Sequence, residues 1–126
     1  MRRIALRVRI PGTDGKRSRN SPWDIRIEGV TFELKTATED VHGNYQFNHI
    51  RYHRTYQGLL CIGIGPDMIL FDAWSKADAT TGQAGHLVSM DRGSSATYKL
   101  TRRPGQLRRI REFEDHMLDL LGELQA

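Results

Sequence analysis

The chain has 126 residues, of which 38% are hydrophobic and 27% charged, and its formal net charge at pH 7 is +4. A chain of this length is typical of one domain with its own core, so we expect a single domain over residues 1–126. The composition excludes a disordered or collagen-like chain. No apolar run reaches the ~20 residues of a membrane span, so no membrane partner is expected.

The first part of the chain predicts strands separated by a loop. Residues 4–10 alternate apolar and basic side chains towards their end, which is typical of a half-exposed strand. Residues 11–22 are rich in Gly, Ser, Asn and Pro and predict a loop. Residues 24–28 and 31–36 alternate with period two on either side of Gly29, which predicts a hairpin or a kinked pair of strands.

The middle of the chain predicts a helix followed by two strands. Residues 45–56 contain no helix breaker and place Phe47, Ile50 and Arg54 on one helical face. The two strands are expected over residues 59–64 and 68–74. Cys61, the single cysteine, falls within the first of them and is expected to be buried. A lone cysteine forms no internal disulfide, which favours a reducing, cytoplasmic compartment.

The last segment predicts an amphipathic helix over residues 105–124. Its apolar side chains recur at spacings of three and four residues and are Leu107, Ile110, Phe113, Met117, Leu118, Leu121 and Leu124. Pro104 suits the first turn of such a helix, whereas residues 75–97 are polar and give no clear assignment. The order of strands, helix, strands and helix predicts an α/β (α+β) domain in two or three layers.

The second strand of the hairpin carries the side chains with the clearest chemistry. Alternate side chains of a strand share a face, so Glu33 and Lys35 are expected on one exposed face that borders a cleft. Phe32 and Leu34 share the other face and are expected in the core. Asp24 opens the preceding strand and lies near Glu33 if the two strands pair. Two converging carboxylates form an oxygen site that suits Mg²⁺.

The run Ser21-Pro22-Trp23-Asp24, followed after eight residues by Glu33-Leu34-Lys35, resembles the signature of the PD-(D/E)XK nucleases, the restriction-endonuclease-like superfamily. The resemblance covers roughly residues 21–74 and implies a mixed β-sheet flanked by helices. It also implies a metal-dependent endonuclease that hydrolyses DNA phosphodiester bonds, as restriction and homing enzymes do. On this resemblance Asp24, Glu33 and the main-chain carbonyl of Leu34 bind Mg²⁺, for which Mn²⁺ substitutes. Lys35 then acts on the nucleophile.

The chain departs from the family pattern at its N-terminal end. Many members have an N-terminal helix that supplies a further acid, whereas the corresponding stretch here is strand-like and loop-like, with Asp14 as its one acid. Either Gln46 or another polar residue of the predicted helix completes the catalytic site, or a partner subunit does, or the chain is a minimal version. Some members place a Gln on this helix facing the metal, and Gln46, His49 and His53 share one predicted helical face.

Basic side chains gather in two clusters, one in residues 1–20 and one between residues 99 and 111. Clusters on both sides of a nuclease centre favour contact with DNA phosphates, although solvated surface charge is the alternative for each cluster. The candidates for DNA contact are Lys16, Arg17, Arg19, Asn48, His49 and Arg51. A symmetric duplex site is naturally cut by a dimer. We therefore expect a homodimer or higher homo-oligomer, with the 105–124 helix in part of its interface.

A second hypothesis is a catalytically inactive nucleic-acid-binding module of the same fold. The missing N-terminal acid favours this alternative, and the intact Asp24, Glu33 and Lys35 favour the enzyme. Other chemistry lacks support, because the histidines match no zinc spacing and there is neither a dinucleotide loop nor a Gly-x-Ser-x-Gly motif.

Overall fold

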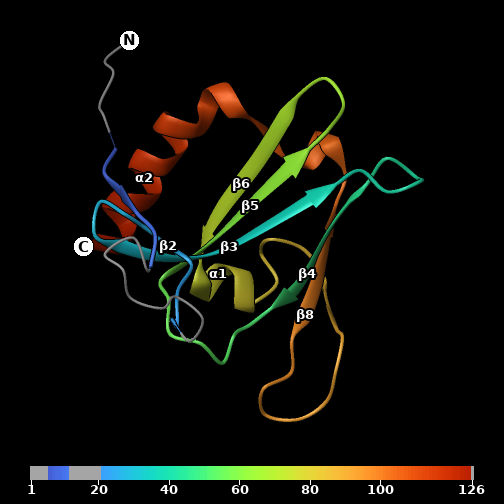
Figure 1. The fold of residues 1–126 in the computed structure, drawn as a ribbon, viewed down its shortest axis with the longest axis horizontal. Coiled ribbons are helices and arrows are strands. Elements are labelled where there is room, and N and C mark those ends of the chain that lie inside the picture. The colour runs from blue at the N-terminus through green and yellow to red at the C-terminus, as the bar shows by residue number, and fades with distance from the viewer. Residues whose placement is uncertain (1–5, 12–20, 126) are drawn as a thin grey trace.

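A six-stranded sheet forms the middle layer of the molecule, with the strand order β1-β2-β3-β5-β6-β9 (Figure 1). The computed structural model describes residues 6–11 and 21–125. The six strands are β1 (Val8–Arg9), β2 (Ile25–Ile27), β3 (Val30–Thr38), β5 (Gly58–Ile64), β6 (Ile69–Ser75) and β9 (Arg108–Arg109). β3 and β5 are parallel, and the other neighbouring strands are antiparallel, so the sheet is mixed.

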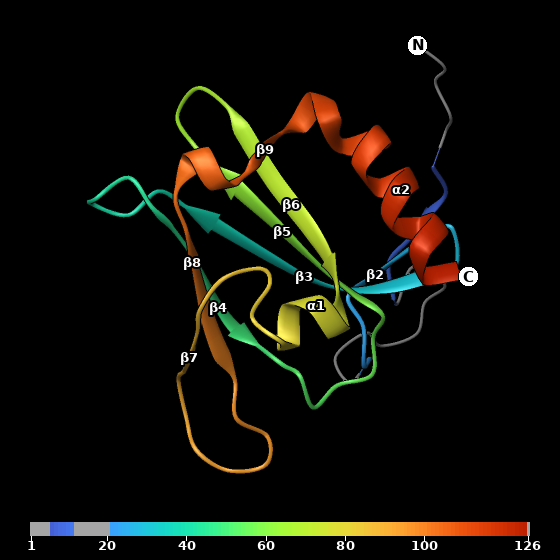
Figure 2. The same cartoon turned by 180° about the vertical axis from the view of Figure 1, so that it is seen from behind.

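A three-stranded sheet of order β4-β8-β7 and two helices complete the molecule (Figure 2). These elements are β4 (Tyr45–Ile50), α1 (Lys76–Thr80), β7 (Leu87–Ser89), β8 (Tyr98–Arg102) and α2 (Phe113–Gln125), with 3₁₀ turns at Pro104–Gln106 and Ile110–Glu112. The chain is therefore a small, mostly β domain of the mixed α+β class. The predicted flanking by helices is correct for α2, whereas the second sheet covers much of the opposite face.

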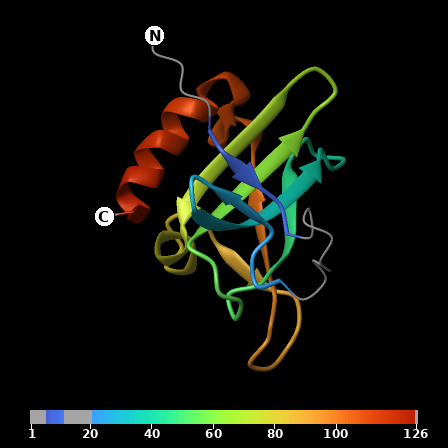
Figure 3. The same cartoon turned by 60° about the vertical axis from the view of Figure 1, so that its left-hand side comes forward.

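Each face of the middle sheet packs into its own hydrophobic core. On one face Phe32 and Phe71 pack with Met117 and other apolar side chains of α2, which lies along that side of the sheet (Figure 3). On the other face Leu59 and Cys61 of β5 pack with the buried side chains of β4, β8 and α1. Because side chains alternate along β3, its Phe32 face belongs to the α2 core and its Glu33 face looks toward the second sheet.

The hairpin predicted around Gly29 is confirmed, with a two-residue turn between β2 and β3. Both turn residues have positive φ, 48° at Glu28 and 81° at Gly29. Glycine adopts this conformation without steric cost, and two-residue turns of this kind match the twist of the strands they join. The turn fixes the register in which Ile25 pairs with Phe32, and this register positions the candidate site.

The helix predicted over residues 45–56 is wrong, because the segment begins with β4 and continues as turns and irregular chain. Tyr45 and Phe47 alternate into the core, as expected for a strand. The pairing of β4 with β8 then becomes irregular, and His49 has a φ of 58°. This bulge returns Ile50 to the buried face three residues after Phe47. The spacing that predicted a helix therefore arises from a bulged strand.

The C-terminal helix is shorter than predicted, because α2 begins at Phe113 and not near residue 105. Arg108–Arg109 instead pair with the edge of β6 as β9, and Pro104 lies in a separate 3₁₀ turn. The strands predicted over residues 59–64 and 68–74 are confirmed as β5 and β6. The unassigned stretch 75–97 contains α1 and β7.

We expect Phe47→Ala to lower the free energy of unfolding by about 3–5 kcal/mol, because it removes a fully buried ring from the core between the sheets. Asn48→Ala, one position further along β4, truncates an exposed side chain and should change stability by less than about 0.5 kcal/mol. Urea denaturation of the two variants measures both values. Equal losses would contradict the strand, in which neighbouring side chains point to opposite faces.

Candidate functional site

Asp24 lies directly before β2, where the regular pairing with β3 ends at Ile25 and Phe32. The backbone N–H of Asp24 donates to the Phe32 carbonyl at 2.9 Å. Asp24 Oδ2 also accepts a hydrogen bond from the backbone N–H of Leu34 at 2.9 Å, which fixes the aspartate side chain.

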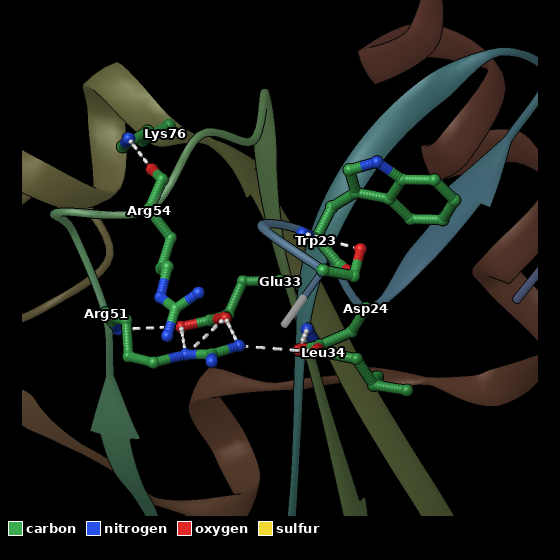
Figure 4. A network of polar contacts seen from close by, with 8 residues as sticks. Trp23, Asp24, Glu33, Leu34, Arg51, Arg54 and Lys76 are labelled. Atoms are coloured by element: carbon green, nitrogen blue, oxygen red, sulfur yellow. Dashed lines mark hydrogen bonds and ion pairs between the residues drawn. The ribbon is translucent and has the colours of Figure 1, made fainter. Parts of the chain in front are cut away.

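Arg51 lies in the segment after β4, and its guanidinium lies between the two carboxylates (Figure 4). Its Nη2 is 2.6 Å from Glu33 Oε1 and 3.3 Å from Asp24 Oδ1. Its Nε is 3.1 Å from Glu33 Oε1. The backbone N–H of Arg51 donates separately to Glu33 Oε2 at 2.6 Å. One residue therefore gives Glu33 both a main-chain donor and charged side-chain donors.

Glu33 is fully buried, which corrects the expectation that it lies on an exposed face. Its exposed fraction is 0%, whereas the side chains of Asp24 and Arg51 are exposed by 34% and 24%. A buried carboxylate is tolerated when its charge is paired and hydrogen-bonded, and Arg51 provides both. The hydrogen bonds with Glu33 raise the pKa of Arg51 above its ordinary value, so the guanidinium stays charged.

Lys35 follows Glu33 by two residues on the same face of β3 and is half-buried, so their predicted shared face is confirmed. The parallel pairing of β3 with β5 places Lys35 beside Cys61. Burial raises the pKa of the Cys61 thiol well above its ordinary value, and the charge of Lys35 offsets part of this effect. The predicted burial of the cysteine is also confirmed.

Two tyrosines of the segment after β4 bring buried hydroxyls close to Glu33. Within the described part of the chain, neither the Tyr52 nor the Tyr56 hydroxyl has a hydrogen-bond partner. Burial raises the pKa of both tyrosines, and the negative charge of Glu33 raises each of them further. The Lys76 ammonium lies 4.6 Å from the centre of the Tyr56 ring and donates to the carbonyl of Arg54, which ties this segment to α1 (Figure 4).

The carboxylate pair fits a hard divalent cation. Asp24 and Glu33 already share one positively charged nitrogen, and Mg²⁺ is commonly held by one or two carboxylates with water in its remaining positions. The unpartnered tyrosine hydroxyls are the kind of buried polar group that such water satisfies. The described residues contain no group of three or more His, Cys, Asp or Glu that could hold a metal.

Gln46 lies outside this site, which corrects its predicted position near the metal. Its Nε2 donates to Asp40 Oδ2 at 2.8 Å, and Gln46 pairs with Thr101 of β8. Asp40 follows Glu33 by seven residues of mostly extended chain, a span of about 20 Å. The physical reason is that Gln46 belongs to a strand and not to the predicted helix. For the same reason Gln46, His49 and His53 share no helical face.

The other sequence candidates remain predictions. Asn48 and His49 are exposed at the end of β4, where His49 Nδ1 lies 2.9 Å from Thr97 Oγ1. The Leu34 carbonyl stays a predicted metal ligand, while the Leu34 N–H is the group that binds Asp24. Outside the described residues lie Lys16, Arg17 and Arg19.

Sequence reasoning missed the pairing of Arg51 with Glu33 and Asp24. Arg51 was expected to contact DNA from a helix, and 18 residues separate it from Glu33. The available signal is a general one, because a carboxylate on the inner face of a covered strand requires a cationic or hydrogen-bonding partner. The arginine that follows the apolar side chains of β4 is such a partner.

Comparisons with known protein families, with curated proteins and with solved structures gave no match for this chain. Neither helix of the described residues has the length and apolar character needed to cross a bilayer.

We expect Glu33→Ala and Arg51→Ala each to destabilise the fold by up to about 3–5 kcal/mol, because each leaves a charged partner without compensation. The double variant should lose less than the sum of the two, with a coupling free energy of about 0.5–3 kcal/mol. Urea denaturation of the four proteins in the cycle measures this coupling. Strictly additive losses would contradict a direct ion pair.

Proposed function

We propose that the chain is a metal-dependent endonuclease that hydrolyses DNA phosphodiester bonds. The observation that carries the proposal is that Asp24 and Glu33, at the open end of one hairpin, share a single cationic nitrogen. Lys35 follows on the same strand face. The resemblance to the PD-(D/E)XK nucleases, which implies roles for these three residues, supports the same proposal. We also propose that the chain binds DNA, forms a homo-oligomer and acts in the cytoplasm.

In the proposed reaction Asp24 and Glu33 would hold Mg²⁺, for which Mn²⁺ would substitute. The chemistry supplied there would be that of a Lewis acid, which activates water and neutralises charge on the phosphodiester. Lys35 supplies a compact positive charge that orients the attacking water or steadies a phosphate oxygen. The hydrogen bond from the Arg51 backbone N–H keeps the Glu33 carboxylate in place throughout.

A homo-oligomer would use a surface other than the apolar face of α2. Met117, Leu120 and Leu121 of this helix are buried in the core against the middle sheet. The expected contribution of the 105–124 helix to an interface is therefore not part of the proposal.

A second candidate function is a nucleic-acid-binding module without catalytic activity. The observation that favours it is the Arg51 guanidinium itself, which already balances the charge of the buried Glu33. If this guanidinium never leaves, the two carboxylates are not free to bind a metal ion. The chain then lacks the ion that the proposed hydrolysis requires. The two functions differ in whether the chain cleaves DNA when a divalent ion is present.

We expect the wild-type chain to nick or linearise supercoiled plasmid in Mg²⁺ or Mn²⁺, and to leave it intact in excess chelator. Asp24→Asn keeps an acceptor for the Leu34 N–H but removes the negative charge of the carboxylate. Lys35→Met removes the ammonium and keeps a side chain of similar length. Each variant should lose about 100-fold or more in cleavage rate, the usual effect of removing one group that stabilises transition-state charge.

The matched control for this assay is Asp67→Asn, in the exposed turn between β5 and β6 at the far end of the strands from Glu33. It should cleave like the wild type, and melting curves should show that all the proteins are folded. Full cleavage by Asp24→Asn would remove this site from consideration. Metal-independent DNA binding by an inactive wild-type chain would favour the binding module.

We expect neutralisation of Lys16, Arg17 and Arg19 to reduce the salt dependence of DNA binding. Each phosphate contact contributes about −0.9 to the slope of log affinity against log salt, so the triple alanine variant should flatten the slope by up to about 3. Titration of metal-free protein with duplex DNA at several salt concentrations measures the slope. The loss should be similar on unrelated duplex sequences, and an unchanged slope would place the DNA elsewhere.

A further inference from the structure

We propose that Arg51 is an exchangeable internal cation, whose guanidinium leaves the carboxylates when a divalent metal binds and then contacts a nucleic-acid phosphate. This inference rests on the proposed function for the metal and the nucleic acid. It adds that the Arg51 side chain couples the binding of the metal to the binding of the nucleic acid.

The first supporting observation is that two separate groups attach Arg51 to Glu33. The backbone N–H donates to Glu33 Oε2, while the guanidinium binds Glu33 Oε1 and Asp24 Oδ1. If the guanidinium swings away, the backbone hydrogen bond still holds the segment after β4 against β3. The exchange therefore requires a change of side-chain rotamer and no rearrangement of the sheet.

The second observation concerns exposure. The Arg51 side chain is 24% exposed and the Asp24 side chain is 34% exposed, whereas Glu33 is fully buried. The pair therefore opens to solvent on the Asp24 side, where a metal ion could enter and the guanidinium could leave. Once outside, a planar guanidinium can bind a phosphate through two parallel hydrogen bonds.

The third observation is the balance of charge. With the guanidinium in place, Arg51 and Lys35 balance the two carboxylates, so the site offers a phosphate little net attraction. A divalent ion neutralises both carboxylates and releases the positive charge of Arg51 for the phosphate. Metal and nucleic acid should therefore each raise the affinity for the other, and the two effects must be equal.

The test measures Mn²⁺ affinity by titration calorimetry in three proteins: the wild type, Arg51→Ala and Arg108→Ala. The last is the matched control, because Arg108 pairs with the buried carboxylate of Asp72 near the other edge of the sheet. We expect Arg51→Ala to bind Mn²⁺ more tightly than the wild type, within the roughly 5–150-fold range of such couplings. Its melting temperature should also rise more on addition of Mn²⁺. Arg108→Ala should match the wild-type affinity.

A second measurement repeats the titration with a short duplex DNA present, in a Lys35→Met background in which cleavage should be about 100-fold slower or more. The duplex should raise the Mn²⁺ affinity when Arg51 is present and should have a much smaller effect when it is alanine. If Arg51→Ala does not fold, Arg51→Lys replaces it, because its point charge lacks the guanidinium fork and should also bind Mn²⁺ more tightly than the wild type.

Equal or weaker Mn²⁺ binding in the Arg51 variants than in the wild type would overturn the exchange and leave the proposed metal site standing. No Mn²⁺ binding in any of the proteins would overturn the proposed metal site and the exchange together. The two failures are therefore distinct.

Discussion

The buried charge of Glu33 is the constraint on which the arrangement of the candidate site depends. The carboxylate lies on the inner face of β3, between the middle sheet and the second sheet, where water cannot compensate it. Arg51 supplies the compensation, and it reaches Glu33 because the bulged end of β4 directs the following segment back over β3. The second sheet therefore positions Arg51, which neutralises the Glu33 carboxylate of the middle sheet.

A buried ion pair is a weak means of stabilising a core, since well-packed apolar residues of similar volume often serve equally well. Glu33 lies beside Leu59 of β5, in a layer that is otherwise largely apolar, and the Tyr52 and Tyr56 hydroxyls there have no partner in the described chain. Packing alone gives no reason for so many polar groups at one place. The proposed cation site would account for the buried carboxylate and for the two hydroxyls together.

The parts of the site that could be predicted from the sequence are those encoded within a few residues. Alternation along 31–36 predicted that Glu33 and Lys35 share a face, and the turn at Gly29 predicted that Asp24 lies near Glu33, because a hairpin brings the start of its first strand close to the second. The bulge at His49 was not predictable, since its three-residue spacing imitates a helix. The pairing of Arg51 depends on that bulge and on contacts across 18 residues, so it was missed as well.

The position of the Arg51 guanidinium distinguishes the two candidate functions. While Arg51 remains between the carboxylates, it and Lys35 balance their charge, so the surface around Asp24 offers a phosphate backbone little net attraction. A binding module without metal would therefore have to recruit DNA through basic side chains elsewhere. Under the proposed exchange, a metal ion would make this surface positive and would free an arginine suited to phosphate. Metal and nucleic acid would then bind together, which is the property that separates the two candidate functions.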